Sequence, residues 1–202
     1  MRSPQTLSEA DRRTVAAWAA DCAEHVLEIF EAAAPGDGRP RDLIARTRAF
    51  ARGELDVAEG IRRRFAGGVP AREVHAPAAA AAARAAGQAA AIPHMGAHAL
   101  GAAAYAAKAA GLAAPDRADA VREEVRWQLD HMSAAVRAAL RLLPPVGENA
   151  AGPLGPGLLA SGLLGAIIGD LQASLAEADG VPTARSHHRS REMIQKPGRG
   201  GC

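Results

Sequence analysis

The chain has few aromatic residues, with two tryptophans, one tyrosine and three phenylalanines among 202 residues. Aromatics make up 3% of the sequence and hydrophobic residues 49%, so alanine and leucine must fill the interior. A buried alanine removes little apolar area from water, and each Å² is worth roughly 25 cal/mol. We therefore expect stability to come from many close contacts rather than from a few large side chains.

Cysteine is also scarce, since only Cys22 and Cys202 are present. Two cysteines do not form the framework that is typical of small secreted domains, and Cys22 lies in an apolar helical stripe, where we expect a small core residue. The first residues, MRSPQTLSEADRR, lack the apolar stretch of a secretory signal. These features favour a reducing compartment, and we expect a cytoplasmic protein.

The sequence has no large excess of charge of one sign. Its 24 Lys and Arg against 22 Asp and Glu give a formal net charge of +2, which is too small for electrostatic capture of nucleic acid. Common catalytic motifs are missing as well, because there is no GxSxG elbow, no P-loop and no GxGxxG after a strand. The sequence predicts neither a nucleic-acid partner nor a cofactor, and it favours a non-enzymatic protein.

Alanine is what the chain has in abundance. In the stretch Ala76–Ala114, 23 of 39 residues are alanine. Alanine has the best helix propensity, and its methyl side chain lets two helices approach closely. We expect two tightly packed helices here, separated near Ile92 and Pro93 and ended by Gly111. The polar residues of this stretch are few and therefore conspicuous: Arg84, Gln88, His94, His98, Tyr105 and Lys108.

Apolar residues that recur every three to four positions predict further helices. We expect one over about 9–33, one over about 41–52, one after Gly53, and a long one from about 116 to 143. Short turns between helices make neighbours antiparallel. The predicted fold is therefore all-α, a compact bundle or a short stack of antiparallel helical hairpins. It has about six helices and an additional C-terminal amphipathic helix.

The composition changes after Pro144. Residues 149–169 carry no charge and are numerous enough to cross a bilayer, but they include six glycines and two prolines. We expect a helical domain at 1–145, a Gly/Pro linker at 146–157, an amphipathic helix at 158–178 and a disordered tail at 179–202. The amphipathic helix is expected to pack on a protein surface, with membrane association as the lesser alternative.

His94 and His98 are the first candidates for a functional site. Four residues apart on a helix, their rings leave the same face, which suits two ligands of one metal ion. Zinc needs a third ligand and usually a fourth. Glu124 and His131 carry suitable groups, but nothing in the sequence places them nearby.

The alternative is a polar seam in which these histidines and Tyr105 fix the register of the alanine helices or contact a partner. Trp127 is a separate candidate, because it lies opposite the apolar stripe of its predicted helix, on a second face with Glu124, His131 and Ala134. A tryptophan in that position must be covered by another part of the chain or must itself cover a partner. We therefore include Trp127 among the candidate partner-binding residues.

Four segments occur in a characteristic order: WAADCAEHVLEIFE, RPRDLIARTRAFARGE, AIPHMGAHALGAAAYAAKAAG and REEVRWQLDHM. Over about residues 14–143 they resemble the bacterial immunity-protein-five-like family, proposed partners of polymorphic toxins. The resemblance implies a non-enzymatic, all-helical domain that binds and neutralises a cognate toxin protein. The positions that carry the resemblance are Trp18, Cys22, Arg41, Arg52, Gly53, His94, His98, Tyr105, Lys108, Trp127 and Gln128. The alternative function is a small helical metal-binding protein or metal-dependent hydrolase that uses His94 and His98.

Overall fold

The computed structural model describes residues 3–63 and 70–177, and these residues form nine α-helices and three short 3₁₀ turns without a strand. The predicted all-α class is confirmed. The predicted tail at 179–202 lies outside the described residues. The helices are α1 (Glu9–His25), α2 (Leu27–Ala33), α3 (Arg39–Ala51), α4 (Val57–Arg63), α5 (Pro77–Ala90), α6 (His98–Ala113), α7 (Arg117–Asp130), α8 (Ala134–Arg141) and α9 (Gly162–Glu177).

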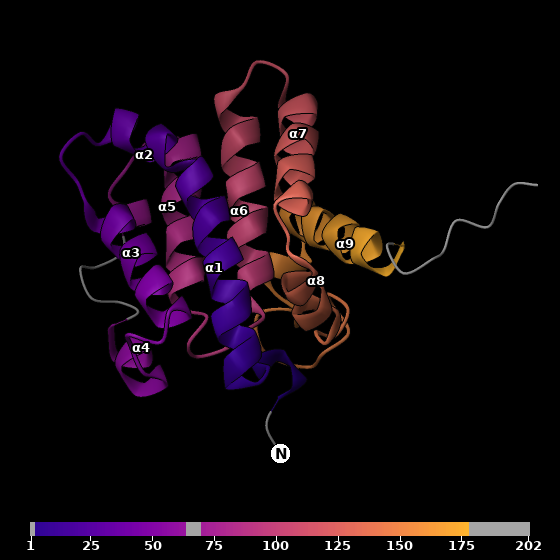
Figure 1. Cartoon of the computed structure of the whole chain (residues 1–202). Helices are drawn as coiled ribbons and strands as arrows, with labels where there is room; N and C mark the ends of the chain where they lie inside the picture. The colour runs from indigo at the N-terminus through magenta and orange to yellow at the C-terminus, as the bar shows by residue number, and fades with distance from the viewer. Residues whose placement is uncertain (1–2, 64–69, 178–202) are drawn as a thin grey trace, which may run out of the picture.

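The two alanine-rich helices, α5 and α6, lie side by side at the centre of the molecule (Figure 1). Most of their alanines are completely buried. At Gly101 of α6, an added Cβ would come within 2.5 Å of the Gln88 Oε1 atom of α5 and 2.9 Å of Leu159. Here a methyl group would already crowd the neighbouring side chains. The predicted close-packed alanine hairpin is confirmed.

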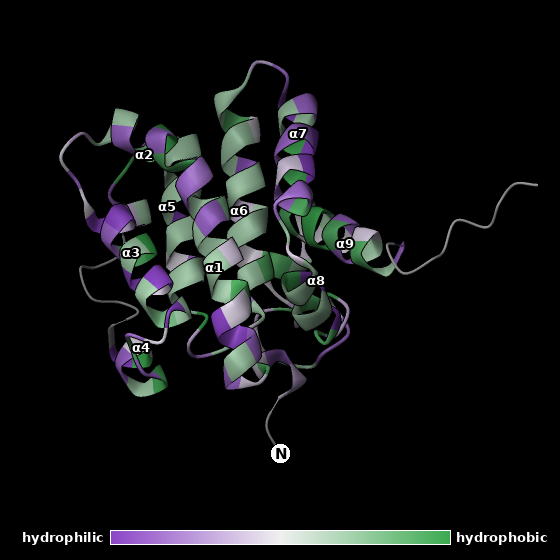
Figure 2. Cartoon of the chain, in the orientation of Figure 1, coloured by the Kyte–Doolittle hydropathy of each residue, from purple (hydrophilic) through white to green (hydrophobic). Residues whose placement is uncertain are grey.

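The other helices surround this hairpin. Helix α1 crosses it and contacts α3 and α8 as well as both alanine helices (Figure 1). Helix α7 lies beside α6, and α9 packs on α6 and α8. Figure 2 shows how the hydropathy differs between these layers, with α5 and α6 weakly apolar and α7 largely polar. The few large side chains of the core are contributed mainly by the surrounding layer, and they include Trp18, Phe30, Phe50, Ile167, Ile168 and Leu171.

The C-terminal part shares this core. Leu154 is fully buried, and its backbone N–H donates to Gln5 Oε1 at 2.9 Å. Gln5 Nε2 in turn donates to the Ala151 carbonyl at 2.6 Å, so the predicted linker packs against the N-terminal residues.

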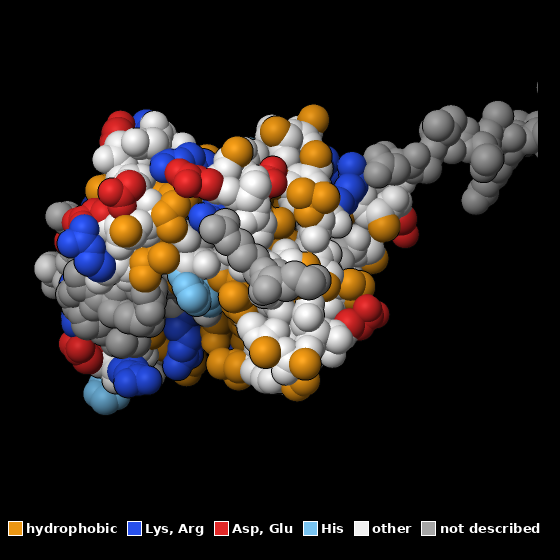
Figure 3. Space-filling model, turned by 90° about the horizontal axis from the view of Figure 1, so that it is seen from below, with side chains coloured by type: hydrophobic (Ala, Val, Ile, Leu, Met, Phe, Trp, Pro, Cys, Tyr) orange, Lys and Arg blue, Asp and Glu red, His pale blue; other side chains and the backbone are white. Residues whose placement is uncertain are grey.

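Three large hydrophobic side chains stay exposed, Leu142, Leu158 and Leu163. Seen from below, hydrophobic side chains extend over the α8 side of the molecule and charged ones gather mainly on the α3 and α4 side (Figure 3).

No helix in the described part of the chain combines the length and the hydropathy that a bilayer crossing requires. The predicted amphipathic helix at 158–178 corresponds to the short turn Leu158–Ala160 followed by α9. Its apolar stripe, Leu164, Ile167, Ile168, Leu171 and Leu175, is buried. This segment therefore places its apolar face against the protein itself.

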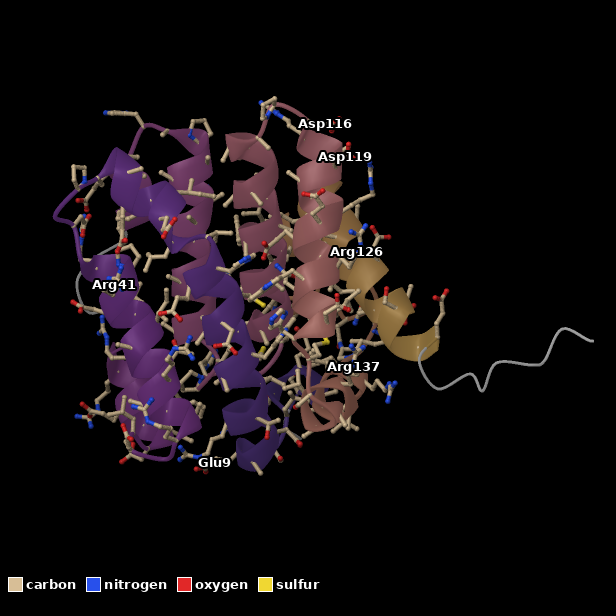
Figure 4. All side chains as sticks on the ribbon, turned by 45° about the horizontal axis from the view of Figure 1, so that its top comes forward. Glu9, Arg41, Asp116, Asp119, Arg126 and Arg137 are labelled. Atoms are coloured by element: carbon tan, nitrogen blue, oxygen red, sulfur yellow. The ribbon has the colours of Figure 1, made fainter. Side chains whose placement is uncertain are left out.

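Two helices predicted as continuous are each divided, at Val26 and at residues 131–133, so the described residues form nine helices where about seven were predicted. The second division has a clear physical cause. Ser133 caps α8, because its side chain accepts a hydrogen bond from the Val136 N–H at 3.2 Å. Arg137 turns back and donates to the Leu129 carbonyl at the end of α7. Figure 4 shows Arg137 on α8, beside that end of α7. The spacing of apolar residues continues unchanged across residues 131–133, so periodicity alone did not predict that the helix ends there.

The close packing of the alanine core predicts that a larger side chain will destabilise it. Ala103 of α6 is completely buried, and its carbonyl accepts a hydrogen bond from Gln128 of α7 at 3.1 Å. Ala103→Leu is expected to lower the free energy of unfolding in urea by about 1–3 kcal/mol, because the added atoms overpack the interface. Leucine is nearly as good a helix former as alanine, so propensity contributes little. The matched control is Ala166→Leu on the exposed face of α9, which is expected to stay within about 0.5 kcal/mol. Equal effects of the two substitutions would contradict this account of the core.

Candidate functional site

Trp127 forms a surface stack with two histidines, which we call the aromatic stack. The His25 ring centroid lies 3.7 Å from that of Trp127, with 7° between the planes. The His131 centroid lies 4.1 Å away, with 25° between the planes. His25 ends α1, whereas Trp127 belongs to α7 and His131 follows α7 directly. Trp127 is half-buried and both histidines are exposed, so the stack faces solvent with its rings held in place.

A buried polar network holds the stack from below. Glu124 is 5% exposed and Gln128 is fully buried, one turn apart on α7. The two oxygens of Glu124 have separate partners: Oε2 lies 2.7 Å from His25 Nδ1, and Oε1 accepts from Gln128 Nε2 at 2.8 Å. The same Gln128 amide donates to the Ala103 carbonyl of α6. The network therefore ties α1, α6 and α7 together and fixes the ring plane of His25 against Trp127.

The C-terminal end of α7 is held by side chains. Trp18 of α1 donates its indole N–H to the Gln128 carbonyl at 3.0 Å. The His131 Nδ1 atom lies 2.7 Å from the Trp127 carbonyl, where it can only be the donor because a carbonyl can only accept. The last carbonyls of a helix have no partner within the helix, so such side chains stabilise its end. Both surface histidines are thus anchored through Nδ1, and neither Nε2 atom has a hydrogen-bond partner among the described residues.

A groove runs along α1 next to the stack. One part, which we call the acidic pocket, has a volume of about 300 Å³ and is lined by Asp21, Glu24, His25, Trp127 and His131. The adjoining part has about 430 Å³ and extends along α1 to Thr14 and onto the start of α8. Both parts include Asp21 and His131, so they form one continuous surface between α1, α7 and α8.

Arg48 of α3 orders the acidic side of this groove. Its Nη1 atom lies 2.7 Å from Asp21 Oδ1, and its Nη2 atom donates to Glu24 Oε2 at 2.5 Å. Partial burial would lower the pKa of Arg48, but the bonds and charges of the two carboxylates outweigh it and raise that pKa above its ordinary value. The two carboxylates are therefore held in fixed positions at the surface.

Two residues of the predicted polar seam, His98 and Tyr105 of α6, contact α5. His98 Nδ1 lies 2.8 Å from Gln88 Oε1, and the Arg84 guanidinium lies 5.9 Å from the centroid of the Tyr105 ring. Tyr105 is only 3% exposed; burial raises the pKa of its hydroxyl, and the charge of Arg84 partly opposes that rise. These contacts join α5 to α6, and the role of the seam in fixing helix register stays a prediction. The seam residues do not join Trp127, whose ring contacts are with His25 and His131.

The premise that His94 and His98 share one helix is wrong. Helix α6 begins at His98, and His94 lies exposed in the preceding turn because Pro93 and Gly96 interrupt the helical pattern. The two ring centroids are 6.5 Å apart. Among the described residues, no group of three or more His, Cys, Asp or Glu side chains is arranged to hold a metal ion. The metal hypothesis gains no third ligand from this geometry and stays a prediction.

Sequence reasoning placed Glu124 and His131 on one helical face with Trp127, but it missed His25, which completes the stack. His25 and Glu124 are 99 residues apart, so their contact depends on how α1 and α7 pack. One signal was nevertheless present. Glu124, Trp127, Gln128 and His131 recur at steps of three and four on one helical face, which is the face that packs against α1 and α6.

Cys22 is fully buried in this region, and burial raises the pKa of its thiol well above the ordinary value.

Compared with known protein families, residues 5–135 match the family described as "Imm-5 like putative immunity protein". No curated protein and no solved structure matches the chain significantly. The matched range begins before α1 and ends at the first turn of α8, so it includes all three rings of the aromatic stack. It does not include the segment after α8 that joins the core through Leu154 and α9.

Proposed function

This chain belongs to the Imm-5-like immunity protein family, and we propose that it binds a cognate bacterial toxin and neutralises it. The proposed partner is a protein, and the proposed mechanism is occlusion of a toxin surface without chemical turnover. We place this action in the cytoplasm, as the cysteine usage predicts. The proposed binding surface is the groove along α1 with the aromatic stack at its edge.

The observation that supports this surface is the solvent-facing stack of three rings around Trp127. Tryptophan is among the residues that contribute most to protein–protein binding, because it offers a large apolar area and one hydrogen-bond donor. The Trp127 indole N–H has no hydrogen-bond partner among the described residues. An unpaired indole donor at the edge of an open groove is suited to an acceptor on a partner.

The rigidity of the stack also favours binding. Association costs about 0.5–1.5 kcal/mol for each flexible side chain that must become ordered. His25 is already fixed by Glu124, and His131 by the Trp127 carbonyl. Much of this ordering cost is therefore met when the protein folds, and more of the contact energy remains for affinity.

The experiment that tests the proposal is protection in a bacterial host. A toxin domain sought among the genes neighbouring this one is expressed alone and together with this chain. We expect growth arrest with the toxin alone, restored growth on co-expression, and a complex of the two purified proteins. Continued arrest with both proteins present, or protection without a complex, would show that the proposed function is wrong.

A further inference from the structure

We propose that the acidic pocket binds a guanidinium group, so that the protein partner places an arginine side chain in this pocket, against the carboxylates of α1 and the aromatic stack. This inference rests on the proposed function, because it takes the partner to be a protein. It adds the chemical class of the group that the pocket recognises. Charge, unused hydrogen-bond acceptors and the planar rings each support it.

The two carboxylates of the pocket retain unused acceptor atoms. Asp21 and Glu24 are three residues apart on α1, and each gives one oxygen to Arg48. Their other oxygens, Asp21 Oδ2 and Glu24 Oε1, accept no hydrogen bond from the described residues. Each carboxylate offers about four lone-pair sites, so both can accept from a second guanidinium while Arg48 stays in place. Arg48 thus holds two acceptors in position.

The charge of the pocket favours a cation. Its lining contains Asp21 and Glu24 but no lysine or arginine. Arg48 approaches from α3 and balances only one of these two negative charges. Behind the rings, the buried carboxyl group of Glu124 is the further acidic group that faces the pocket's histidines. An anionic group of a partner would be repelled here, whereas a positively charged side chain would be attracted.

The aromatic rings favour arginine over lysine. A guanidinium is planar, stacks on aromatic faces, and donates several hydrogen bonds in fixed directions. A lysine ammonium is a compact, strongly hydrated charge that gains less from planar neighbours. The lining combines a pair of carboxylates from α1 with the rings of the aromatic stack. This arrangement matches a group that stacks and donates at the same time.

The test uses small probes and needs no toxin. N-acetylarginine methylamide is titrated into the ¹⁵N-labelled full-length protein, and the neutral isostere N-acetylcitrulline methylamide is the control ligand. The chain has two tryptophans and hence two indole N–H signals, and Trp127→Phe identifies the one from the stack. We expect the arginine probe to shift this signal saturably in the millimolar range, as is usual for a single small group.

Two double variants provide the control for charge. Asp21→Asn with Glu24→Gln removes the acceptor pair and is expected to weaken the arginine response about tenfold. Glu28→Gln with Asp42→Asn removes two exposed carboxylates that do not line the pocket, and it is expected to leave the response unchanged. A response that citrulline reproduces, one that the pocket variant retains, or no response at all would overturn the inference.

This test is separate from that of the proposed function. If the chain protects against the toxin but does not bind the arginine probe, only the guanidinium pocket is wrong. If the probe binds as expected but the chain gives no protection, the pocket is real and the proposed function is wrong.

Discussion

Replacing Trp127 with alanine is expected to weaken binding of the cognate toxin by about 30-fold or more and to abolish protection in the bacterial host. Truncation of a central aromatic residue in an interface typically costs about 2 kcal/mol or more. Here the truncation also removes the ring that both His25 and His131 stack on. Titration calorimetry with the purified toxin domain measures the loss of affinity.

Two controls separate binding from folding. Trp127→Phe keeps an aromatic ring between the histidines, so it is expected to lose less affinity than the alanine variant. Leu158→Ala removes a side chain that is 67% exposed and does not line the groove, and it is expected to bind normally. Thermal unfolding of each variant checks that the fold survives. Affinity within about twofold of the parent for Trp127→Ala would place the binding surface elsewhere.

Sequence predicted the alanine hairpin well, because the information there is local. Helix propensity, the interruption near Pro93 and the small size of alanine all act within a few residues. The buried stripe of α9 was equally accessible, since Leu164, Ile168 and Leu171 repeat at helical spacing. In these elements, the face that would be buried could be inferred without knowing which helix would cover it.

Local sequence patterns did not predict which residues of α7 are buried. Its apolar residues Val121, Val125 and Leu129 are only half-buried, while Glu124 and Gln128 are buried. Apolar periodicity therefore predicted only part of the inner face, because these residues pack against the core beside the buried Glu124 and Gln128. The polar side chains can be buried because partners on α1 and α6 satisfy them, and those partners lie far away in the sequence. A pattern based on hydropathy has no information about such partners.

The candidate site shows the same limit. Trp127 was identified from its position opposite the stripe, on one face with His131, but His25, which completes the stack, was not connected to it. Conversely, His94 and His98 were proposed as metal ligands because they are four residues apart. That spacing places both rings on one face only if both residues are helical. The capping residue Ser133 was the local signal for the end of α7, and it was outweighed by a long apolar repeat.

Replacing Trp18 with alanine is expected to have the largest effect on stability, about 3–5 kcal/mol in the free energy of unfolding. The Trp18 side chain is 2% exposed, in a core that contains few other large residues. It also donates the hydrogen bond that satisfies the Gln128 carbonyl at the end of α7. Domains of this size have a total stability of about 5–15 kcal/mol, so this variant would lose a large part of it. Urea unfolding followed by circular dichroism measures the loss.

Trp18→Phe separates the contribution of core packing from that of the hydrogen bond to the Gln128 carbonyl. It keeps most of the ring volume but leaves the Gln128 carbonyl without its donor, and we expect a cost of about 1–3 kcal/mol. Because that carbonyl belongs to the turn that carries Trp127 and His131, the phenylalanine variant should also move the Trp127 indole signal while the protein remains folded. A loss of stability with an unmoved Trp127 signal would mean that Trp18 only fills the core. A moved signal would mean that the core of α1 positions the surface stack, so that folding stability and partner binding depend on the same contact.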